Sequence, residues 1–308
     1  GARFGKAQAG SRAEDLPLVT GRGQFTDDLV LPAQAHVVFV RSTFAHAEIV
    51  SVDTSMAASM PGVLAVVTGR ELVDAGLGAI PPLAIFTGRN DQPMVSASMP
   101  VLAANKVCYV GEPVALIVAE TVHQAMDAAE AVAVDYRQLP AVSDVTRAMA
   151  PDAPRIWPDA PGNVVLDWEE GDAAAADAAF ARAAHVARVR LLDTRLAPSA
   201  MEPRAALATY DPAAERYTLT APTQGVAVVR KILTEAVFKV PTETIRVLTH
   251  DVGGGFGMKV QTYPEYAALL YAARRVARPV KWTATRLESF LADTHGRDGV
   301  LEGELALD

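Results

Sequence analysis

Cysteine is almost absent from this sequence: Cys108 is the only one among 308 residues. A single thiol excludes an intrachain disulfide framework, a cysteine-rich zinc site and an iron–sulfur cluster ligated by this chain alone. Cys108 itself lies in a predicted strand and is expected to pack as a small apolar residue. The 6 histidines are scattered, without an HExxH motif or a paired spacing. No metal site built from side chains is therefore predicted.

Long apolar runs and an excess of positive charge are absent as well. No stretch approaches the roughly 18 uninterrupted apolar residues of a membrane span, and none near the first residue has the pattern of a secretory signal. Lys and Arg number 28 against 36 Asp and Glu, a net charge of −8. Binding of nucleic acid or anionic membranes needs clustered Lys and Arg. We therefore expect a soluble cytoplasmic protein whose main partner is neither nucleic acid nor an anionic membrane.

The sequence is rich in apolar residues: 50% are hydrophobic, which is enough to form a sizeable core. Residues 1–15 are polar and unpatterned and predict an N-terminal arm. Short strands alternate with short helices over residues 16–145, which is typical of an α+β domain. Prolines concentrate in residues 146–162, which predicts a linker. Residues 163–308 form a second unit of mixed helices and strands.

Hydrophobic periodicity and turn residues predict the individual elements. Strands are expected over 35–41, 63–68, 106–110, 114–119, 132–136, 164–168, 186–192, 205–210, 216–220, 244–248, 279–283 and 300–307. Helices are expected over 53–60, 69–75, 121–130, 172–183, 225–238, 264–276 and 286–291. Residues 76–104 are rich in proline and glycine and predict an irregular excursion.

The most unusual local feature is a run of glycines, VGGGFGMK, at residues 252–259. Glycine allows positive φ and close approach of the backbone, so successive N–H groups can face an anion or an oxo group. The spacing fits neither a Walker A loop nor a dinucleotide fingerprint, which argues against a phosphate or nucleotide binder. A tight turn with no ligand is the simpler alternative.

A few polar side chains stand out by their context. Gln224 precedes a predicted helix, where an amide more often caps the helix than contacts a ligand. Glu202 and Arg204 flank a proline at the start of a strand, and such a pair is more often a surface ion pair than a catalytic one. The tyrosines at 263, 266 and 271 are expected to pack a helix against the core.

Several motifs, in the same order along the chain, resemble the molybdenum hydroxylases. This is the family of xanthine dehydrogenase, aldehyde oxidoreductase and aerobic carbon monoxide dehydrogenase large subunits. The motifs are GRGQFTDD (21–28), FVRSTFAHA (39–47), MPGV (60–63), VGEPVA (110–115), VGGGFGMK (252–259), YPEY (263–266), RPVKWT (278–283) and HGRD (295–298). The resemblance implies an α/β-hammerhead domain over residues 16–145, followed by the first part of a molybdopterin-binding domain.

The resemblance also implies roles for individual residues. Gln224 would support an oxo ligand of molybdenum, and Gly254, Gly255, Phe256 and Gly257 would lie against the cofactor. That cofactor is molybdopterin or its cytosine dinucleotide form, with no metal ligand from a side chain. The role of Gln224 would be positioning and electrostatic support, not proton transfer.

The implied reaction is hydroxylation of an aldehyde or an N-heterocycle with water as the oxygen source. Electrons would leave through 2Fe-2S clusters and FAD, carried by an iron–sulfur subunit and a FAD subunit. Val260 stands where purine-oxidising members carry a glutamate, which argues against xanthine. The family's general base lies beyond Asp308, so a second molybdopterin-domain polypeptide, or the remainder of a truncated chain, would complete the site. The alternative is a non-catalytic assembly module that docks partners.

Overall fold

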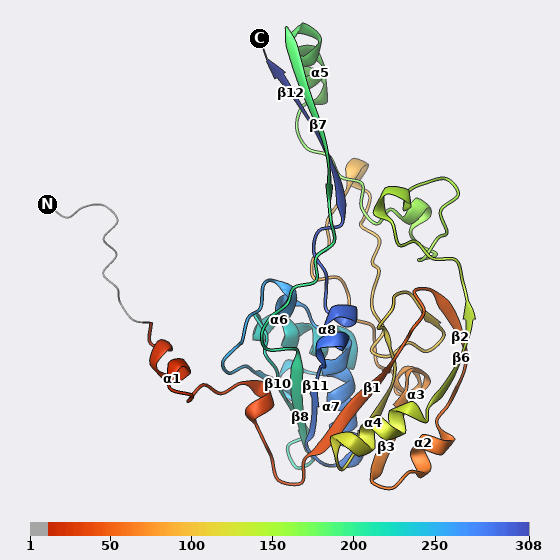
Figure 1. The fold of residues 1–308 in the computed structure, drawn as a ribbon, viewed down its shortest axis with the longest axis vertical. Helices are drawn as coiled ribbons and strands as arrows, with labels where there is room; N and C mark the ends of the chain where they lie inside the picture. The colour runs from red at the N-terminus through yellow and green to blue at the C-terminus, as the bar shows by residue number, and fades with distance from the viewer. Residues whose placement is uncertain (1–11, 308) are drawn as a thin grey trace, which may run out of the picture.

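The main sheet combines strands from both halves of the chain. The structure, a computed structural model, describes residues 12–307, so residues 1–11 of the predicted arm lie outside it. The seven strands run in the order β10-β9-β8-β11-β1-β5-β3 (Figure 1). Their bounds are β1 Ala35–Arg41, β3 Val63–Thr68, β5 Pro113–Ala119, β8 Ala205–Asp211, β9 Arg216–Thr220, β10 Ile245–Leu248 and β11 Val280–Thr283.

The two halves meet where β1 pairs in parallel with β11, with Ala35 opposite Val280. Helix α7 (Pro264–Val276) packs on this sheet with Tyr266, Leu269 and Leu270 fully buried. Tyr263 and Tyr266 lie in the same core, and Tyr271 packs against it, as the helix-packing interpretation predicted. One hydrophobic core therefore contains residues of both predicted domains. The domain boundaries given in the sequence analysis remain a prediction.

A second, three-stranded sheet has the order β4-β2-β6 and lies in the first half of the chain. It consists of β2 (Ala47–Asp53), β4 (Lys106–Val107) and β6 (Ala133–Gln138). Helices α2 (Ser55–Ser59), α3 (Gly69–Asp74) and α4 (Val122–Glu130) accompany the two sheets. The sequence analysis did not predict β2, because most of its residues are only partly buried and their pattern is weak.

The remaining helices follow the predictions with one addition and one change of type. Helix α1 (Asp15–Val19) was not predicted. Helices α5 (Ala173–Arg182) and α8 (Arg286–Ala292) were predicted. Helix α6 (Val226–Lys231) continues as a π-helix from Ile232 to Phe238.

The predicted strand at residues 164–168 is wrong. This segment belongs to no ladder and makes only scattered main-chain contacts, such as Val95 N–H to the carbonyl of Val165 (2.8 Å). Its neighbour is the irregular, proline-rich excursion, which offers no regular strand edge to pair with. An apolar run alone cannot supply that partner.

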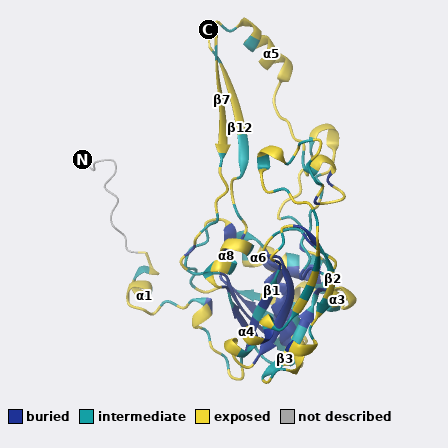
Figure 2. Ribbon diagram, turned by 45° about the vertical axis from the view of Figure 1, so that its right-hand side comes forward, coloured by how far each residue is buried: buried dark blue, intermediate teal, exposed yellow. Residues whose placement is uncertain are grey.

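A two-stranded ribbon of β7 (His185–Asp193) and β12 (Gly299–Leu307) projects from the body (Figures 1 and 2). One of its faces carries the cross-strand ion pairs Arg188–Glu304 and Arg190–Glu302. The other face is apolar, and its large side chains are about half exposed or slightly more: Val189, Leu191, Leu301, Leu305 and Leu307. No helix within residues 12–307 is long and apolar enough to cross a membrane.

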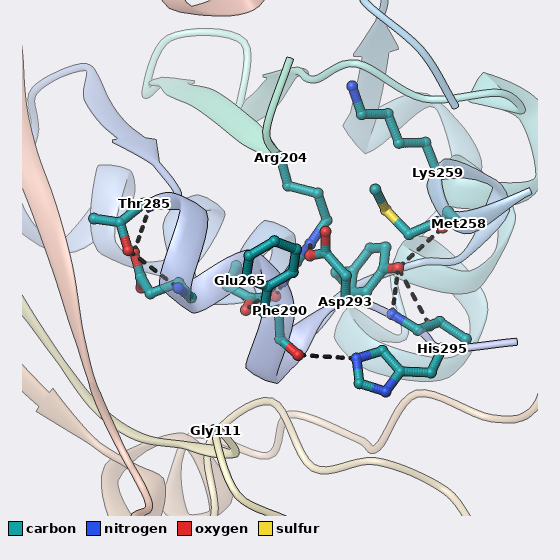
Figure 3. A network of polar contacts seen from close by, with 12 residues as sticks. Gly111, Arg204, Met258, Lys259, Glu265, Thr285, Phe290, Asp293 and His295 are labelled. Atoms are coloured by element: carbon teal, nitrogen blue, oxygen red, sulfur yellow. Dashed lines mark hydrogen bonds and ion pairs between the residues drawn. The ribbon is translucent and has the colours of Figure 1, made fainter. Parts of the chain in front are cut away.

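A buried network of charges holds the body together around Arg204, which is fully buried at the start of β8 (Figure 3). Its guanidinium donates to Glu265 of α7 (2.7 and 3.2 Å) and to Asp293 after α8. Arg41 of β1 donates to the same Glu265 (2.9 Å) and to Glu288 of α8. The expected surface pair of Glu202 and Arg204 is therefore wrong, since Arg204 is in the core and Glu202 binds elsewhere.

The two arginines determine the charge state of Glu265. Burial alone would raise the pKa of this carboxyl, but Arg204 and then Arg41 outweigh it and lower the pKa to about 2. Breaking such a buried pair by removing one partner leaves an uncompensated charge, at a cost of about 3–5 kcal/mol. The network thus ties β1, β8, α7 and α8 to one another.

A third buried carboxyl, Glu112, lies outside this network and forms no ion pair with any residue that the structure describes. It is 4% exposed and accepts the N–H of Cys108 (2.6 Å). Burial raises its pKa to about 7, against the hydrogen bonds from Cys108 and Tyr109 and the more distant charge of Lys106. Because this pKa lies above its ordinary value of 4.5, the protonated form stabilises the fold, and that contribution is lost as pH rises through about 7.

We therefore predict that Glu112→Gln removes a pH dependence of stability. Relative to wild type, the variant should gain about 2–3 kcal/mol of unfolding free energy between about pH 5 and about pH 8. Urea unfolding at both pH values measures this difference. The same change at Glu120, an exposed carboxylate at the end of β5, serves as the control and should leave the wild-type profile. Parallel pH profiles for wild type and Glu112→Gln would contradict the prediction.

Candidate functional site

The glycine run follows β10 and bends sharply along its length. Gly254, Phe256 and Gly257 all have positive φ, at 99°, 51° and 80°. Glycine adopts this region freely, but phenylalanine does so at a cost. The Phe256 side chain is 74% exposed, so no core packing compensates for that cost. The run is therefore a shaped loop at the surface of the body.

The loop leaves a row of backbone donors open. The N–H groups of Gly254, Gly255 and Phe256 make no hydrogen bond with any described residue, whereas those of Gly253, Gly257 and Met258 are all engaged. Successive free N–H groups in a loop with positive φ form a concave anion-binding surface. This arrangement agrees with the interpretation of the glycines as donors toward an anion or oxo group.

Gln224 lies directly against this loop. Its Oε1 accepts the N–H of Gly257 (3.1 Å), and a Cβ at Gly255 would come within 2.4 Å of its Cδ. Gly255 is thus required for the contact. The amide nitrogen of Gln224 has no partner within residues 12–307, and the residue is exposed. Since Oε1 is occupied, the NH₂ group is free to donate to a ligand beside the open N–H groups.

The loop is fastened from behind by Glu202 and Lys259. Lys259 is fully buried, and its amine donates to the Oε2 and main-chain oxygens of Glu202, both at 2.9 Å. The same Oε2 accepts the N–H of Gly253 at 2.8 Å. The sequence analysis missed this pair because a lysine next to glycines carries no sign that it will be buried, and lysine rarely is.

The N-terminal segment also contacts the start of the loop. Asp251 accepts the N–H of Gln24 (2.7 Å) and donates its own N–H to the carbonyl of Gln24 (3.0 Å). Gln24 belongs to the GRGQFTDD motif, which lies more than 200 residues before Asp251 in the sequence. The fold therefore brings the GRGQFTDD motif to the residue that directly precedes the glycine run.

The remaining candidates lie apart from the loop or are engaged in local contacts. Within the described part of the chain, no three His, Cys, Asp or Glu side chains are grouped to hold a metal ion. His295 contacts the carbonyl of Phe290 (Figure 3), and Cys108 is half-buried just after β4. Burial raises the pKa of the Cys108 thiol, which disfavours the reactive thiolate.

Two family models match the chain and together span most of it. The model described as "Molybdopterin cofactor-binding domain" matches residues 156–308, which include Gln224 and the glycine loop. The model described as "Aldehyde oxidase and xanthine dehydrogenase, a/b hammerhead domain" matches residues 20–140. The predicted fold, a hammerhead domain followed by a molybdopterin-binding region, is confirmed.

Subunits of several oxidoreductases match almost the whole of this chain. The carbon monoxide dehydrogenase large chain of Afipia carboxidovorans is 36% identical, over 96% of this chain and 36% of the relative. The 6-hydroxypseudooxynicotine dehydrogenase complex subunit gamma of Paenarthrobacter nicotinovorans has the same identity and the same two coverages. The structure of quinoline 2-oxidoreductase from Pseudomonas putida 86 superposes with a TM-score of 0.85 at 35% identity, over 96% of this chain and 37% of that one. The chain therefore spans little more than a third of these relatives' length.

The contact between Gly255 and Gln224 leads to a prediction about the loop. Gly255→Ala should displace the Gln224 side chain and free the N–H of Gly257, because the new Cβ would occupy the position of the amide. Loss of one neutral hydrogen bond, worth about 1 kcal/mol, should accelerate exchange of that amide roughly fivefold. Hydrogen–deuterium exchange of a peptide spanning residues 252–260 measures this.

The control for this experiment is Gly296→Ala, since a Cβ at Gly296 meets nothing within 4 Å. That variant should exchange as wild type does throughout the loop. Unchanged protection of the loop in Gly255→Ala would contradict the packing described for Gln224.

Proposed function

We propose a function for this chain, which belongs to the molybdenum hydroxylase family of xanthine dehydrogenase, aldehyde oxidase and carbon monoxide dehydrogenase large subunits. It is a molybdopterin-binding subunit whose glycine loop and Gln224 hold the cofactor. The observation that carries this assignment is the row of three free N–H groups beside the free Gln224 amide.

The residues present fit the cofactor by the chemistry of their donors. Molybdopterin presents anionic phosphate and oxo oxygens, and the loop offers three free N–H donors in a row. Gly254, Gly255 and Phe256 would supply main-chain N–H groups, and Gln224 would supply its amide. Donors fixed before the ligand arrives need little reorganisation during the reaction, which is the usual basis of electrostatic support.

When bound, the cofactor supplies a two-electron oxidation in which water provides the oxygen atom. This chain's own part is to bind and orient that group through Gln224 and the loop, with no proton transfer assigned to Gln224. The backbone donors of the loop cannot be removed by side-chain substitution, so the amide of Gln224 is the group most open to test. A side-chain metal ligand from this chain is not part of the proposal.

The substrate we propose is an aldehyde or an N-heterocycle, and the names of some of the relatives support the second class. Their names include 6-hydroxypseudooxynicotine, nicotine and quinoline. Val260 directly follows the glycine run, where purine-oxidising members of the family carry a glutamate. It therefore offers no carboxylate to a purine. Electrons would pass to 2Fe-2S and FAD subunits in a cytoplasmic complex.

A second polypeptide or further chain would complete the site, and the ribbon offers a surface for it. The apolar face of β7 and β12 carries half-exposed leucines over much of its length. Such a face is stabilised when another surface covers it. The alternative function, a non-catalytic assembly module, would use the same face without a cofactor, so cofactor content separates the two.

The central test measures both substrate turnover and cofactor content in the complete enzyme. Gln224→Ala should lower turnover of an aldehyde or N-heterocyclic substrate by about 100-fold or more, the usual cost of removing one preorganised donor. Gln138→Ala, an exposed glutamine at the end of β6, is the matched control. Molybdenum and pterin are measured per protomer in parallel. Wild-type enzyme that turns over substrate without molybdenum would overturn the proposed function.

The ribbon leads to a separate prediction about assembly. Leu305→Ser removes an apolar side chain from one face, whereas Glu304→Ser changes the adjacent residue on the opposite face. Leu305→Ser should weaken association of the complete enzyme by about 10-fold, because burying a leucine contributes roughly 1.5–3 kcal/mol. Mass measurement over a dilution series detects this. Equal effects of the two variants would show that the apolar face is not the interface.

A further inference from the structure

We propose that Glu202 and Lys259 are positioning residues that set the shape of the glycine loop and the placement of Gln224. Neither residue is expected to touch the cofactor itself. This inference rests on the proposed function, because the loop and Gln224 matter only if they hold a ligand.

A single carboxylate oxygen fastens both ends of the loop. Oε2 of Glu202 accepts the Gly253 N–H (2.8 Å) at the start of the loop and the Lys259 amine (2.9 Å) at its end. The main-chain N–H of Glu202 donates to the carbonyl of Gly253 (3.0 Å) as well. A Cβ at Gly253 would lie 2.5 Å from the Cβ of Glu202, so the two backbones approach as closely as glycine permits. The spacing between residues 253 and 259 is therefore fixed from outside the loop.

Lys259 transmits this constraint to Gln224 through its main chain. The carbonyl oxygen of Lys259 accepts the N–H of Gln224 (3.0 Å) and the hydroxyl of Thr223 (3.1 Å). The side chain of Gln224 then returns to the loop at Gly257. Hydrogen bonds thus link Glu202 to Lys259, Lys259 to Gln224 and Gln224 to Gly257, and the chain of the loop joins Gly257 back to Lys259. A displacement of Lys259 would move both ends of Gln224.

The polar contacts of Glu202 all end on the loop, in contrast to those of Arg204. Arg204, two residues later, directs its guanidinium into the core network. Glu202 makes side-chain bonds only to Gly253 and Lys259, and its other oxygen, Oε1, is buried without a partner among residues 12–307. A carboxylate kept to stabilise the core would be expected to use both oxygens. Its placement is better explained by the loop than by the core.

The charge of the pair matters because the ion pair, unlike the exposed Gln224, is buried. Burial lowers the pKa of the Lys259 amine, and the hydrogen bond and charge of Glu202 oppose that effect. Lys259 is fully buried, and among residues 12–307 Glu202 is its only side-chain partner within hydrogen-bond distance. Removing one partner alone leaves the other charge uncompensated, so single variants lose stability for that reason alone. A variant that removes both charges separates stability from positioning.

The test compares Glu202→Gln/Lys259→Met with Glu304→Gln in the complete enzyme. Glu304→Gln removes the carboxylate of an exposed ion pair with Arg188 on the distant ribbon. The double variant should retain a denaturant midpoint close to wild type, because no unpaired buried charge remains. Exchange of the peptide spanning residues 252–260 should rise about 10-fold, and molybdenum and pterin per protomer should fall. Glu304→Gln should match wild type in all three measurements.

Wild-type loop protection together with wild-type cofactor content in the double variant would overturn the inference. A lower denaturant midpoint in the double variant, with hydrogen exchange rising equally in all peptides, would also overturn the inference. The pair would then serve the stability of the fold. If wild-type enzyme holds no molybdenum, the proposed function fails. The exchange of the loop peptide still decides whether Glu202 and Lys259 shape the loop.

Discussion

Arg204 is the charge on which the arrangement of this protein depends. Its guanidinium is fully buried and paired with Glu265 and Asp293, while Arg41 reaches the same Glu265 from the other half of the chain. Such charges are tolerated inside a protein only when every partner is in place. Strands β1 and β8 and helices α7 and α8 are therefore held in one relative position.

The candidate site follows from that position. Arg204 directly precedes β8 inside the core, and Glu202, separated from it by a proline, lies beside the glycine loop. From there Glu202 reaches Gly253 and Lys259, and Lys259 reaches the main chain of Gln224. A surface made largely of backbone N–H groups needs such external supports, because glycine contributes no side chain to hold its own conformation.

Local sequence patterns were sufficient to predict a helix or strand whose position is marked by its own residues. The apolar run of β5 and the proline-initiated helix α7 were predicted within a residue or so of their observed bounds. Predictions failed where pairing with a distant segment decides the outcome. The apolar residues 164–168 found no strand edge, whereas β2, with its weaker pattern, pairs with β6 along its whole length. Register and pairing of this kind are tertiary properties.

The sequence by itself determined the chemistry available: a loop of glycines, one nearby glutamine, a single cysteine and a set of motifs in family order. Tertiary structure alone decided which of these meet. It buried Lys259 and Arg204, which sequence patterns place at the surface, and it assigned Glu202 to the loop and not to Arg204. The physical reason is that burial of a charge depends on partners supplied by distant elements, and no local spacing encodes them.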